Sequence, residues 1–306
     1  MRTVNIRVIG AESPDNPDVP MYVFGDPDLG PTVSLMAGVH GCEYTAMLGL
    51  RRFLDGLDES KLRGQLRVVP MANITAFKAR SLFVVPVDGM NLNRYFPGNP
   101  DGSYTERLAF AIFENLIRGA DFHIDMHAGD MVEDLEPFTI FDASLVEVQS
   151  RQLAFAYGLP NVIRTERLES PIAGTSSAAA AEAGIASITA EAGGRGIIDE
   201  ESVRLHYDGI LRVLASLGVL LGDYDARPEP AVFNDWVWLR TNVGGWWTPS
   251  VRVGETVSVG QLIGSVAALD GSSKEEIIAT RSGVPLFITS SPAVANDGLL
   301  IGLAIK

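Results

Sequence analysis

The sequence contains one cysteine, Cys42, among its 306 residues. A single cysteine cannot form an internal disulfide, which excludes a disulfide-stapled secreted fold. The first residues, Met-Arg-Thr-Val-Asn, also lack the apolar stretch of a signal peptide. Both absences favour a cytoplasmic location. A catalytic thiol is disfavoured as well, because lone cysteines are usually small buried hydrophobes and the side chain of neighbouring His40 diverges from Cys42.

Positive charge is scarce. Lys and Arg number 24 against 38 for Asp and Glu, so the formal net charge is −14. A field of this sign repels a phosphate backbone, and nucleic acid is therefore not expected as a partner. The chain also lacks any uninterrupted apolar run approaching ~18 residues, so we expect no membrane span and no membrane partner. The oligomeric state is left open, with a homo-oligomer as one option.

Hydrophobic residues make up 46% of the chain and charged residues 20%. These fractions exclude wholesale disorder, collagen and coiled coil. Short apolar runs alternate with helical patterns as far as residue 217, which predicts an α/β domain with mostly parallel strands. The expected strands lie at 33–37, 66–70, 121–127, 137–141, 162–164 and 185–190, and the expected helices at about 43–57, 104–118, 144–157, 176–183 and 202–217.

The pattern changes near residue 224, where a run of prolines and acidic residues follows. Beyond it no helix is expected, and residues 251–264 alternate with a period of two broken by glycines, which is typical of short strands and turns. We therefore predict a catalytic domain at 1–224 and a smaller all-β domain at 225–306.

His40 and Glu43 are the first candidate site, because they follow the buried strand 33–37 directly. In open α/β sheets ligands bind at the carboxyl ends of the strands. An imidazole and a carboxylate three residues apart can converge on one ion, and Zn²⁺ suits this donor set. The alternative is a polar turn in which Glu43 only favours the helix N-terminus.

The second candidate is the strand 121–127. Side chains alternate along a strand, so His123, Asp125 and His127 share one face. Histidines in an apolar strand need a partner, and a metal backed by a carboxylate would supply it; hydrogen-bonded core histidines are the alternative. We prefer His127 as the ligand because it ends the strand, and expect His123 to be packing. With His40 and Glu43 this predicts a catalytic zinc site of three protein ligands and a water.

Glu191 is the third candidate, since it ends another buried strand that runs into glycines. It is placed to act as general base on a water at the metal, or, alternatively, to bond loop amides. Between the two histidine clusters lie Arg80, Asn93 and Arg94. A guanidinium in such a loop can grip a carboxylate in a fork or stabilise an oxyanion, whereas the alternative is a loop held by its own Asn and Gly turns.

Taken together, these residues resemble the succinylglutamate desuccinylase and aspartoacylase family, relatives of the zinc carboxypeptidases. The resemblance spans roughly residues 30–220 and rests on four short motifs in the family's order. The positions that match are the zinc ligands His40, Glu43 and His127, the substrate-carboxylate motif Asn93-Arg94, the general base Glu191, and the arginine that polarises the scissile carbonyl, Arg80.

The resemblance implies a zinc-carboxypeptidase-like mixed sheet flanked by helices, with a barrel-sandwich-like C-terminal domain that shapes or partly closes the cleft. It implies one Zn²⁺ per chain and hydrolytic removal of an acyl group from a small anionic N-acyl amino acid or related carboxylate. Asn91 stands where aspartoacylases usually have Asp, so the broad bacterial deacylase branch is favoured over N-acetylaspartate. A metallocarboxypeptidase acting on peptides or cell-wall stems is one alternative. A catalytically silent binding protein is the other, and Glu191 argues against it.

Overall fold

The computed structural model describes residues 1–8, 10, 17–166, 173–222, 224–225, 227–272 and 274–306. Residues 13–16 of the Pro- and Asp-rich N-terminal stretch, and residues 223 and 226 of the expected linker, lie outside these ranges. Among the described residues, no helix has the length and apolar character needed to cross a membrane.

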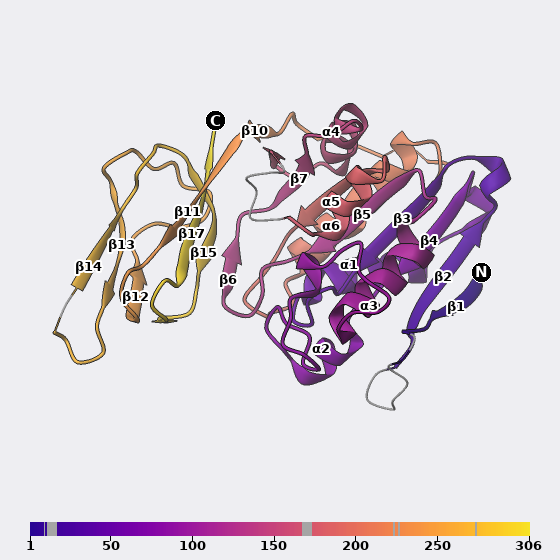
Figure 1. Cartoon of the computed structure of the whole chain (residues 1–306). Coiled ribbons are helices and arrows are strands. Elements are labelled where there is room, and N and C mark those ends of the chain that lie inside the picture. Colours follow the sequence, from indigo (N-terminus) through magenta and orange to yellow (C-terminus); the bar gives the residue numbers. More distant parts are fainter. Residues whose placement is uncertain (9, 11–16, 167–172, 223, 226, 273) are drawn as a thin grey trace.

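A nine-stranded sheet forms the centre of the molecule (Figure 1). Its inner strands β4, β3, β5 and β9 are parallel, whereas β1, β2 and β7 make antiparallel pairings. The sheet is therefore mixed and carries helices, as the sequence predicted. In spatial order its strands are β1 (Arg2–Ile6), β2 (Val19–Gly25), β4 (Gln65–Val69), β3 (Thr32–Ala37), β5 (Phe122–His127), β9 (Ala186–Glu191), β7 (Phe138–Asp142), β8 (Asn161–Thr165) and β10 (Ala231–Phe233).

Helices cover both faces of this sheet. Those on one face are α1 (Tyr44–Gly56), α4 (Glu147–Tyr157) and α6 (Glu200–Ser216). Those on the other are α3 (Tyr104–Ile112), its continuation as the π-helical turn η4 (Phe113–Ile117), and α5 (Ser176–Glu182). The short helix α2 (Ile74–Ala79) precedes the single-turn helix η3 (Leu92–Arg94). The sequence did not predict α2 or the two N-terminal strands.

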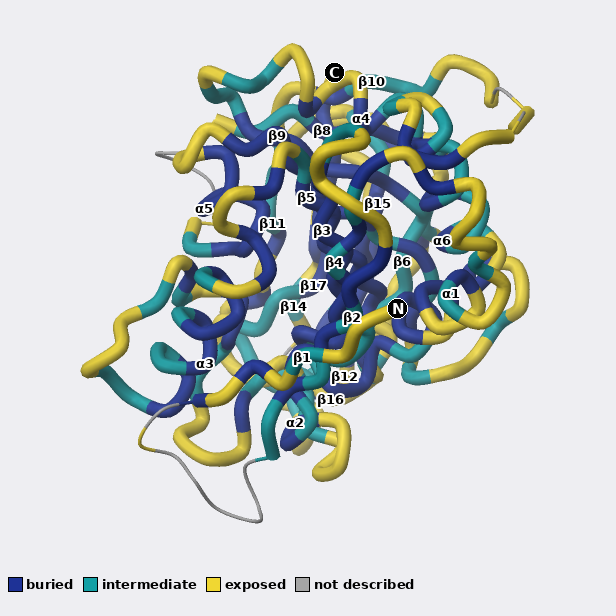
Figure 2. Tube along the Cα trace, turned by 90° about the vertical axis from the view of Figure 1, so that its right-hand side faces the viewer, coloured by how far each residue is buried: buried dark blue, intermediate teal, exposed yellow. Residues whose placement is uncertain are grey.

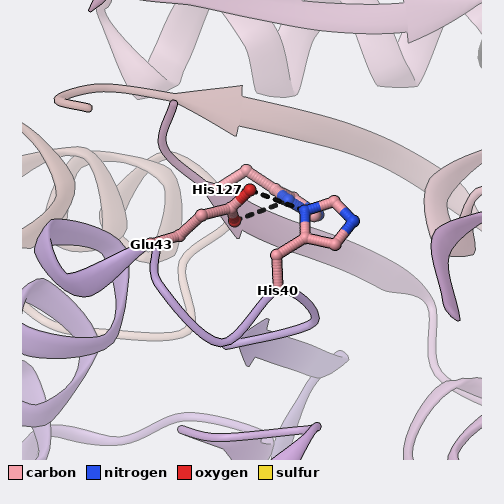
Figure 3. A group of neighbouring side chains, drawn as sticks. All are labelled: His40, Glu43 and His127. Atoms are coloured by element: carbon pink, nitrogen blue, oxygen red, sulfur yellow. Dashed lines mark hydrogen bonds and ion pairs between the residues drawn. The ribbon is translucent and has the colours of Figure 1, made fainter. Parts of the chain in front are cut away.

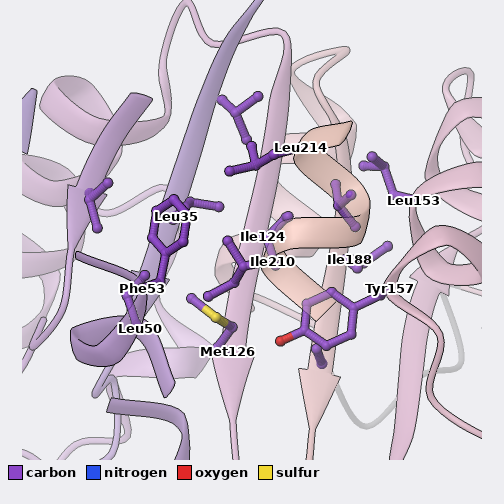
Figure 4. Packing of buried hydrophobic residues seen from close by; sticks show 14 of the residues in the cluster. Leu35, Leu50, Phe53, Ile124, Met126, Leu153, Tyr157, Ile188, Ile210 and Leu214 are labelled. Carbon is purple, nitrogen blue, oxygen red and sulfur yellow. The ribbon is translucent and has the colours of Figure 1, made fainter. Parts of the chain in front are cut away.

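Strand side chains alternate between two hydrophobic cores. Leu35, Ile124 and Ile188 pack with Phe53 and Ile210 against the α1–α6 face (Figure 4). The intervening residues of β5 and β9 face α5 and are polar; His123 lies 3.1 Å from Ser176 Oγ and Thr189 Oγ1 lies 2.8 Å from Ser177 Oγ. Figure 2 shows the central strands as the most continuously buried part of the chain. Burial on both faces holds the strand ends rigidly, which suits a precise site.

The C-terminal part is all-β and consists of two four-stranded antiparallel sheets (Figure 1). One sheet contains β11 (Asp235–Arg240), β17 (Leu299–Ile305), β15 (Val284–Thr289) and β6 (Glu133–Leu135); the other contains β14 (Lys274–Ile278), β13 (Leu262–Ala267), β12 (Gly245–Pro249) and β16 (Ala293–Val294). Two strands are exchanged across the predicted domain division: β6 pairs with β15, and β10 pairs with β8 of the large sheet. The division at residues 224/225 stays a prediction.

Helix α6 packs closely on α4 at Gly209, and we expect Gly209→Ala to destabilise the fold. A Cβ at this position would lie 2.4 Å from Cε1 of Tyr157, a fully buried ring whose hydroxyl bonds His206 Nδ1 at 2.9 Å. Alanine normally stabilises a helix by up to ~1 kcal/mol over glycine, but overpacking a fixed core costs about 1–3 kcal/mol, so the clash should prevail. Denaturant unfolding measures the difference.

Gly56, at the end of α1, provides the matched control. A Cβ there would have only the Tyr207 hydroxyl, at 4.0 Å, within contact range. Gly56→Ala should therefore leave the protein as stable as before or raise the free energy of unfolding by roughly 0.4–1 kcal/mol. Equal effects of the two substitutions would contradict a packing role for Gly209.

Candidate metal centre and active site

Three neighbouring parallel strands, β3, β5 and β9, end at the same edge of the large sheet. His40 follows β3, and Glu43 stands immediately before α1. His127 ends β5 and Glu191 ends β9, in register with each other. The topology therefore gathers four of the predicted residues at one place, because the carboxyl ends of adjacent parallel strands meet there.

His40, Glu43 and His127 form a compact cluster (Figure 3). Glu43 lies between the imidazoles: its Oε1 is 2.6 Å from His40 Nδ1 and its Oε2 is 2.9 Å from His127 Nδ1. One nitrogen from each histidine and one carboxylate oxygen lie within 4.8 Å of one another. The three ligand atoms that the sequence predicted are thus brought together.

The outward nitrogens of both imidazoles are held by other side chains. His40 Nε2 lies 3.1 Å from Asn91 Oδ1, and His127 Nε2 lies 2.9 Å from Asp125 Oδ2. Histidines that bind metals commonly use their second nitrogen in this way, which fixes the ring and leaves the first nitrogen free for the ion. Both Nδ1 atoms accordingly face Glu43.

His123 belongs to a buried network behind the cluster, as the packing interpretation expected. Its Nδ1 lies 2.8 Å from Ser34 Oγ and its Nε2 3.1 Å from Ser176 Oγ, and the Ser176 hydroxyl donates to Asp125. Burial lowers the pKa of His123 to about 4, so the ring is neutral near pH 7. The network connects His123 to the predicted ligand His127 through Ser176 and Asp125.

The two glutamates of the site, Glu43 and Glu191, have pKa values shifted in opposite directions. Burial disfavours the charged form of Glu43, but the adjacent His127 and His40 prevail and lower its pKa to about 2. Glu191 has no such close pairing, and burial, opposed by His127 and reinforced by the carboxylates of Glu43 and Glu133, raises its pKa to about 8. One carboxylate is therefore held as an anion, and the other is suited to exchanging a proton.

The cluster opens into a cavity of about 540 Å³ between the large sheet and the C-terminal strands. Its polar lining includes His40, Glu43, His127 and Glu191. The opposite part is lined by apolar residues, several of them from β11 and β15. The C-terminal part thus shapes the cleft, in line with the expectation for that domain.

The loop residues are divided between the cavity and the surface. Asn93 is buried and lines the cavity, with Nδ2 3.4 Å from His127 Nε2 and Oδ1 accepting from the Ser176 amide. Arg94 also lines it, and no carboxylate pairs with its guanidinium within the described ranges. Arg80, in contrast, caps the end of α2 with an exposed side chain and does not line the cavity.

Two further contributions to the cavity were not predicted from the sequence. Glu133 lines it with a carboxylate that accepts from the Asp130 amide at 2.9 Å, and burial raises its pKa to about 7. Trp236, Trp238 and Phe287 form an aromatic wall from the C-terminal part. The alternating Trp-Val-Trp of β11 was the only local signal, and it does not reveal which surface the tryptophans face.

Comparison with known proteins agrees with this fold. Residues 29–217 match the model of the succinylglutamate desuccinylase/aspartoacylase catalytic domain. Over 278 residues, covering 88% of this chain and 80% of the relative, the chain is 31% identical to N-alpha-acetyl-L-2,4-diaminobutyric acid deacetylase from Halomonas elongata. The fold and the site thus define an α/β protein with a His–Glu–His cluster at the edge of its sheet. The chain belongs to the succinylglutamate desuccinylase/aspartoacylase family.

Solved structures show the same architecture. The product-bound ectoine utilization protein EutE (DoeB) from Ruegeria pomeroyi superposes with a TM-score of 0.86 at 25% identity, covering 94% of this chain and 89% of that one. A succinylglutamate desuccinylase/aspartoacylase from Rhodobacter sphaeroides gives 0.84 at 25% identity with the same coverage, 94% and 89%. The names of the family and its members indicate hydrolytic deacylases that act on amide bonds.

Proposed function

We propose that this protein is a zinc-dependent hydrolase that removes the acyl group from a small N-acyl amino acid or related carboxylate. The observation that carries the proposal is the convergence of His40, Glu43 and His127 beside Glu191 at one cavity. A metal-ligand cluster with a neighbouring free carboxylate is the arrangement of a catalytic site, since a structural site needs no such base.

The donor set fits one Zn²⁺ per chain. Two imidazole nitrogens and one carboxylate are ligands that zinc accepts, and three protein ligands leave a position open for chemistry. Glu43 is buried with its two oxygens directed at His40 Nδ1 and His127 Nδ1, and a buried anion among ligand-type nitrogens is an environment that a cation would stabilise. When bound, the zinc would polarise the scissile carbonyl and acidify a water.

Glu191 would act first as general base and then as general acid in this reaction. Its carboxylate takes the proton from the attacking water while the water oxygen bonds the acyl carbon. It then returns that proton to the nitrogen as the C–N bond breaks, so that a carboxylic acid and an amine leave. The position of Glu191 beside His127, at the end of the adjoining strand, supports both transfers.

Asn93 and Arg94 would bind the substrate carboxylate. The Arg94 guanidinium, which pairs with no carboxylate of the described residues, gives an otherwise acidic cavity a local positive charge, which an anionic substrate requires. The role of Arg80 in stabilising the oxyanion stays a prediction. Because its side chain is exposed, α2 or the substrate would have to move for Arg80 to reach the scissile carbonyl. The C-terminal wall bounds one side of the cavity, which favours a small substrate over a peptide.

Metal analysis and a hydrolysis screen test the function together. The purified protein should contain about one zinc per chain and release amines from N-acyl amino acids, including N-acetyl derivatives of the kind named for the Halomonas relative. Activity should disappear with a chelator and return with zinc. A zinc-loaded, folded protein that hydrolyses no N-acyl amino acid but cleaves peptides would replace the proposal with the carboxypeptidase alternative.

Arg94→Lys tests the substrate carboxylate. Lysine keeps the charge but loses the second parallel hydrogen bond of the guanidinium fork, so kcat/KM should fall by roughly 10- to 150-fold, the equivalent of about 1.5–3 kcal/mol. The wild-type enzyme should prefer an N-acyl amino acid over its carboxamide by a similar factor, and Arg94→Lys should reduce that preference. An unchanged acid-to-amide ratio would show that Arg94 only fixes its loop.

A further inference from the structure

We propose that the cavity binds a bulky apolar group of its substrate, an alkyl chain of about six carbons or an aromatic ring, beyond the reacting amide. This inference rests on the proposed deacylase function and specifies its substrate class. The proposal goes beyond the acetyl group in the name of the Halomonas relative. Its evidence is the register of three neighbouring strands and the aromatic wall above them.

The cavity floor changes from polar to apolar across β9, β7 and β8. Glu191 of β9 is in register with Phe138 of β7. One step further from the edge, Thr189 is in register with Ile140, which is in register with Ile163 of β8. All five side chains line the cavity. Because strands lie ~4.8 Å apart, the apolar floor extends about 10 Å from the general base, the reach of six to eight carbons.

The wall above this floor comes from the C-terminal part. Trp236 lies 5.6 Å from Phe138, Trp238 lies 5.0 Å from Trp236, and Phe287 lies 5.8 Å from Trp238, all measured between ring centroids. These four rings form a continuous row along the cavity. Trp236 is fixed because it packs on Gly302, where any Cβ would lie 2.3 Å from its ring.

The cavity, taken with its polar part, is larger than an acetyl group on a small amino acid would fill. A cavity of about 540 Å³ is within the range that holds a drug-sized ligand, and no charged side chain belongs to the row of rings or to its Ile140 and Ile163 floor. Among these rings and floor residues the polar groups are the indole Nε1–H donors of Trp236 and Trp238, neither of which has a hydrogen-bond partner in the described residues. The rest of this surface is apolar and offers water no hydrogen bond, so an apolar group of the substrate would be favoured there. Each buried CH₂ should raise kcat/KM about fourfold.

Two substrate series test the proposal and distinguish the source of the apolar group. The first lengthens the acyl chain on glycine from acetyl through butanoyl to hexanoyl; the second keeps acetyl and changes alanine to phenylalanine. We expect kcat/KM to rise on the order of 10²-fold along at least one series. The series that rises identifies the acyl chain or the amino-acid side chain as the occupant. A rise of less than about threefold in both would overturn the proposal.

Trp238→Ala should reduce the preference for the bulkier substrate at least tenfold, because it removes the centre of the row of rings. Trp246→Ala is the matched control, since Trp246 lies on β12 with 56% of its surface exposed and outside the cavity. The Trp246→Ala variant should prefer the bulkier substrate by the same factor as the wild type. If both variants changed the preference equally, the effect would not come from the cavity.

Binding of non-hydrolysable ligands to the wild-type protein tests this inference separately from the deacylase proposal. It needs no substituted protein. N-ethylglycine and N-hexylglycine carry the carboxylate and the chain but no acyl bond. Titration calorimetry on the wild-type protein should show N-hexylglycine binding at least tenfold more tightly. That result without hydrolysis of any N-acyl amino acid would retain the apolar site and reject the deacylase. Equal Kd values, together with flat substrate series, would reject the apolar site alone.

Discussion

Replacement of Glu191 by glutamine should leave a folded, metal-loaded protein whose kcat is lower by about 10²–10⁴, the usual cost of losing a general base. Glutamine preserves the shape of the side chain but cannot accept the proton of the attacking water. Residue 191 should keep its position opposite His127 and Phe138, because the backbone pairing of β9 with β5 and β7 fixes the register. Steady-state kinetics, zinc content and thermal unfolding on the same preparation check the three parts of this expectation.

Glu133→Gln is the matched control for Glu191→Gln. Both carboxylates line the cavity, and burial raises the pKa of both. Glu133, however, already accepts the Asp130 amide and belongs to β6, which pairs with the C-terminal sheet rather than with β5. Its replacement should lower kcat less than tenfold. A larger loss for Glu133→Gln than for Glu191→Gln would assign the proton transfer to Glu133.

His127→Ala should abolish zinc binding and with it all turnover. The substitution removes one of three ligand atoms and leaves Glu43 and Asp125 as buried carboxylates without their shared partner. Two remaining ligands on a cavity wall do not make a stable zinc site. Metal analysis after dialysis should show close to no zinc in this variant and about one per chain in the wild type, and His40→Ala should behave like His127→Ala.

His123→Ala provides the contrast, because His123 precedes His127 on the same strand face and is equally buried. Among the described residues it is connected to the proposed ligand His127 through Ser176 and Asp125. We expect the zinc to stay bound, with affinity reduced by no more than the ~10- to 100-fold typical of residues behind a ligand. Competition with a chelator of known affinity measures the change. Loss of zinc in His123→Ala with full occupancy in His127→Ala would reverse the ligand assignment.

The cluster of His40, Glu43 and His127 could be predicted from the sequence because its parts are local. His40 and Glu43 are three residues apart at a strand-to-helix junction, and His127 and Glu191 each end an apolar strand. Once those strands are parallel neighbours, their carboxyl ends must meet. The preference for His127 over His123 required only the strand period and the position of the strand end, and the structure places both as expected.

No comparable local signal marks the strands that join the two parts of the chain. β6 is only three residues long and has an acidic, half-buried sequence, Glu-Asp-Leu. Its partner β15 lies about 150 residues later, and no periodicity encodes such a pairing. β1 was missed for a related reason, because it is an edge strand with mostly exposed residues, whereas β2 is largely buried between β1 and β4 and its alternation was overlooked.

The sequence by itself determined the fold class, the family resemblance, and the four residues His40, Glu43, His127 and Glu191, since period and strand-end position act over a few residues. Only the tertiary structure decided which surfaces enclose them. It placed Trp236 and Trp238 over the apolar floor, left Arg80 exposed, and set Asp125 against His127. These outcomes depend on contacts between segments far apart in the chain, whose free energy comes from packing complementary surfaces and has no counterpart in local pattern.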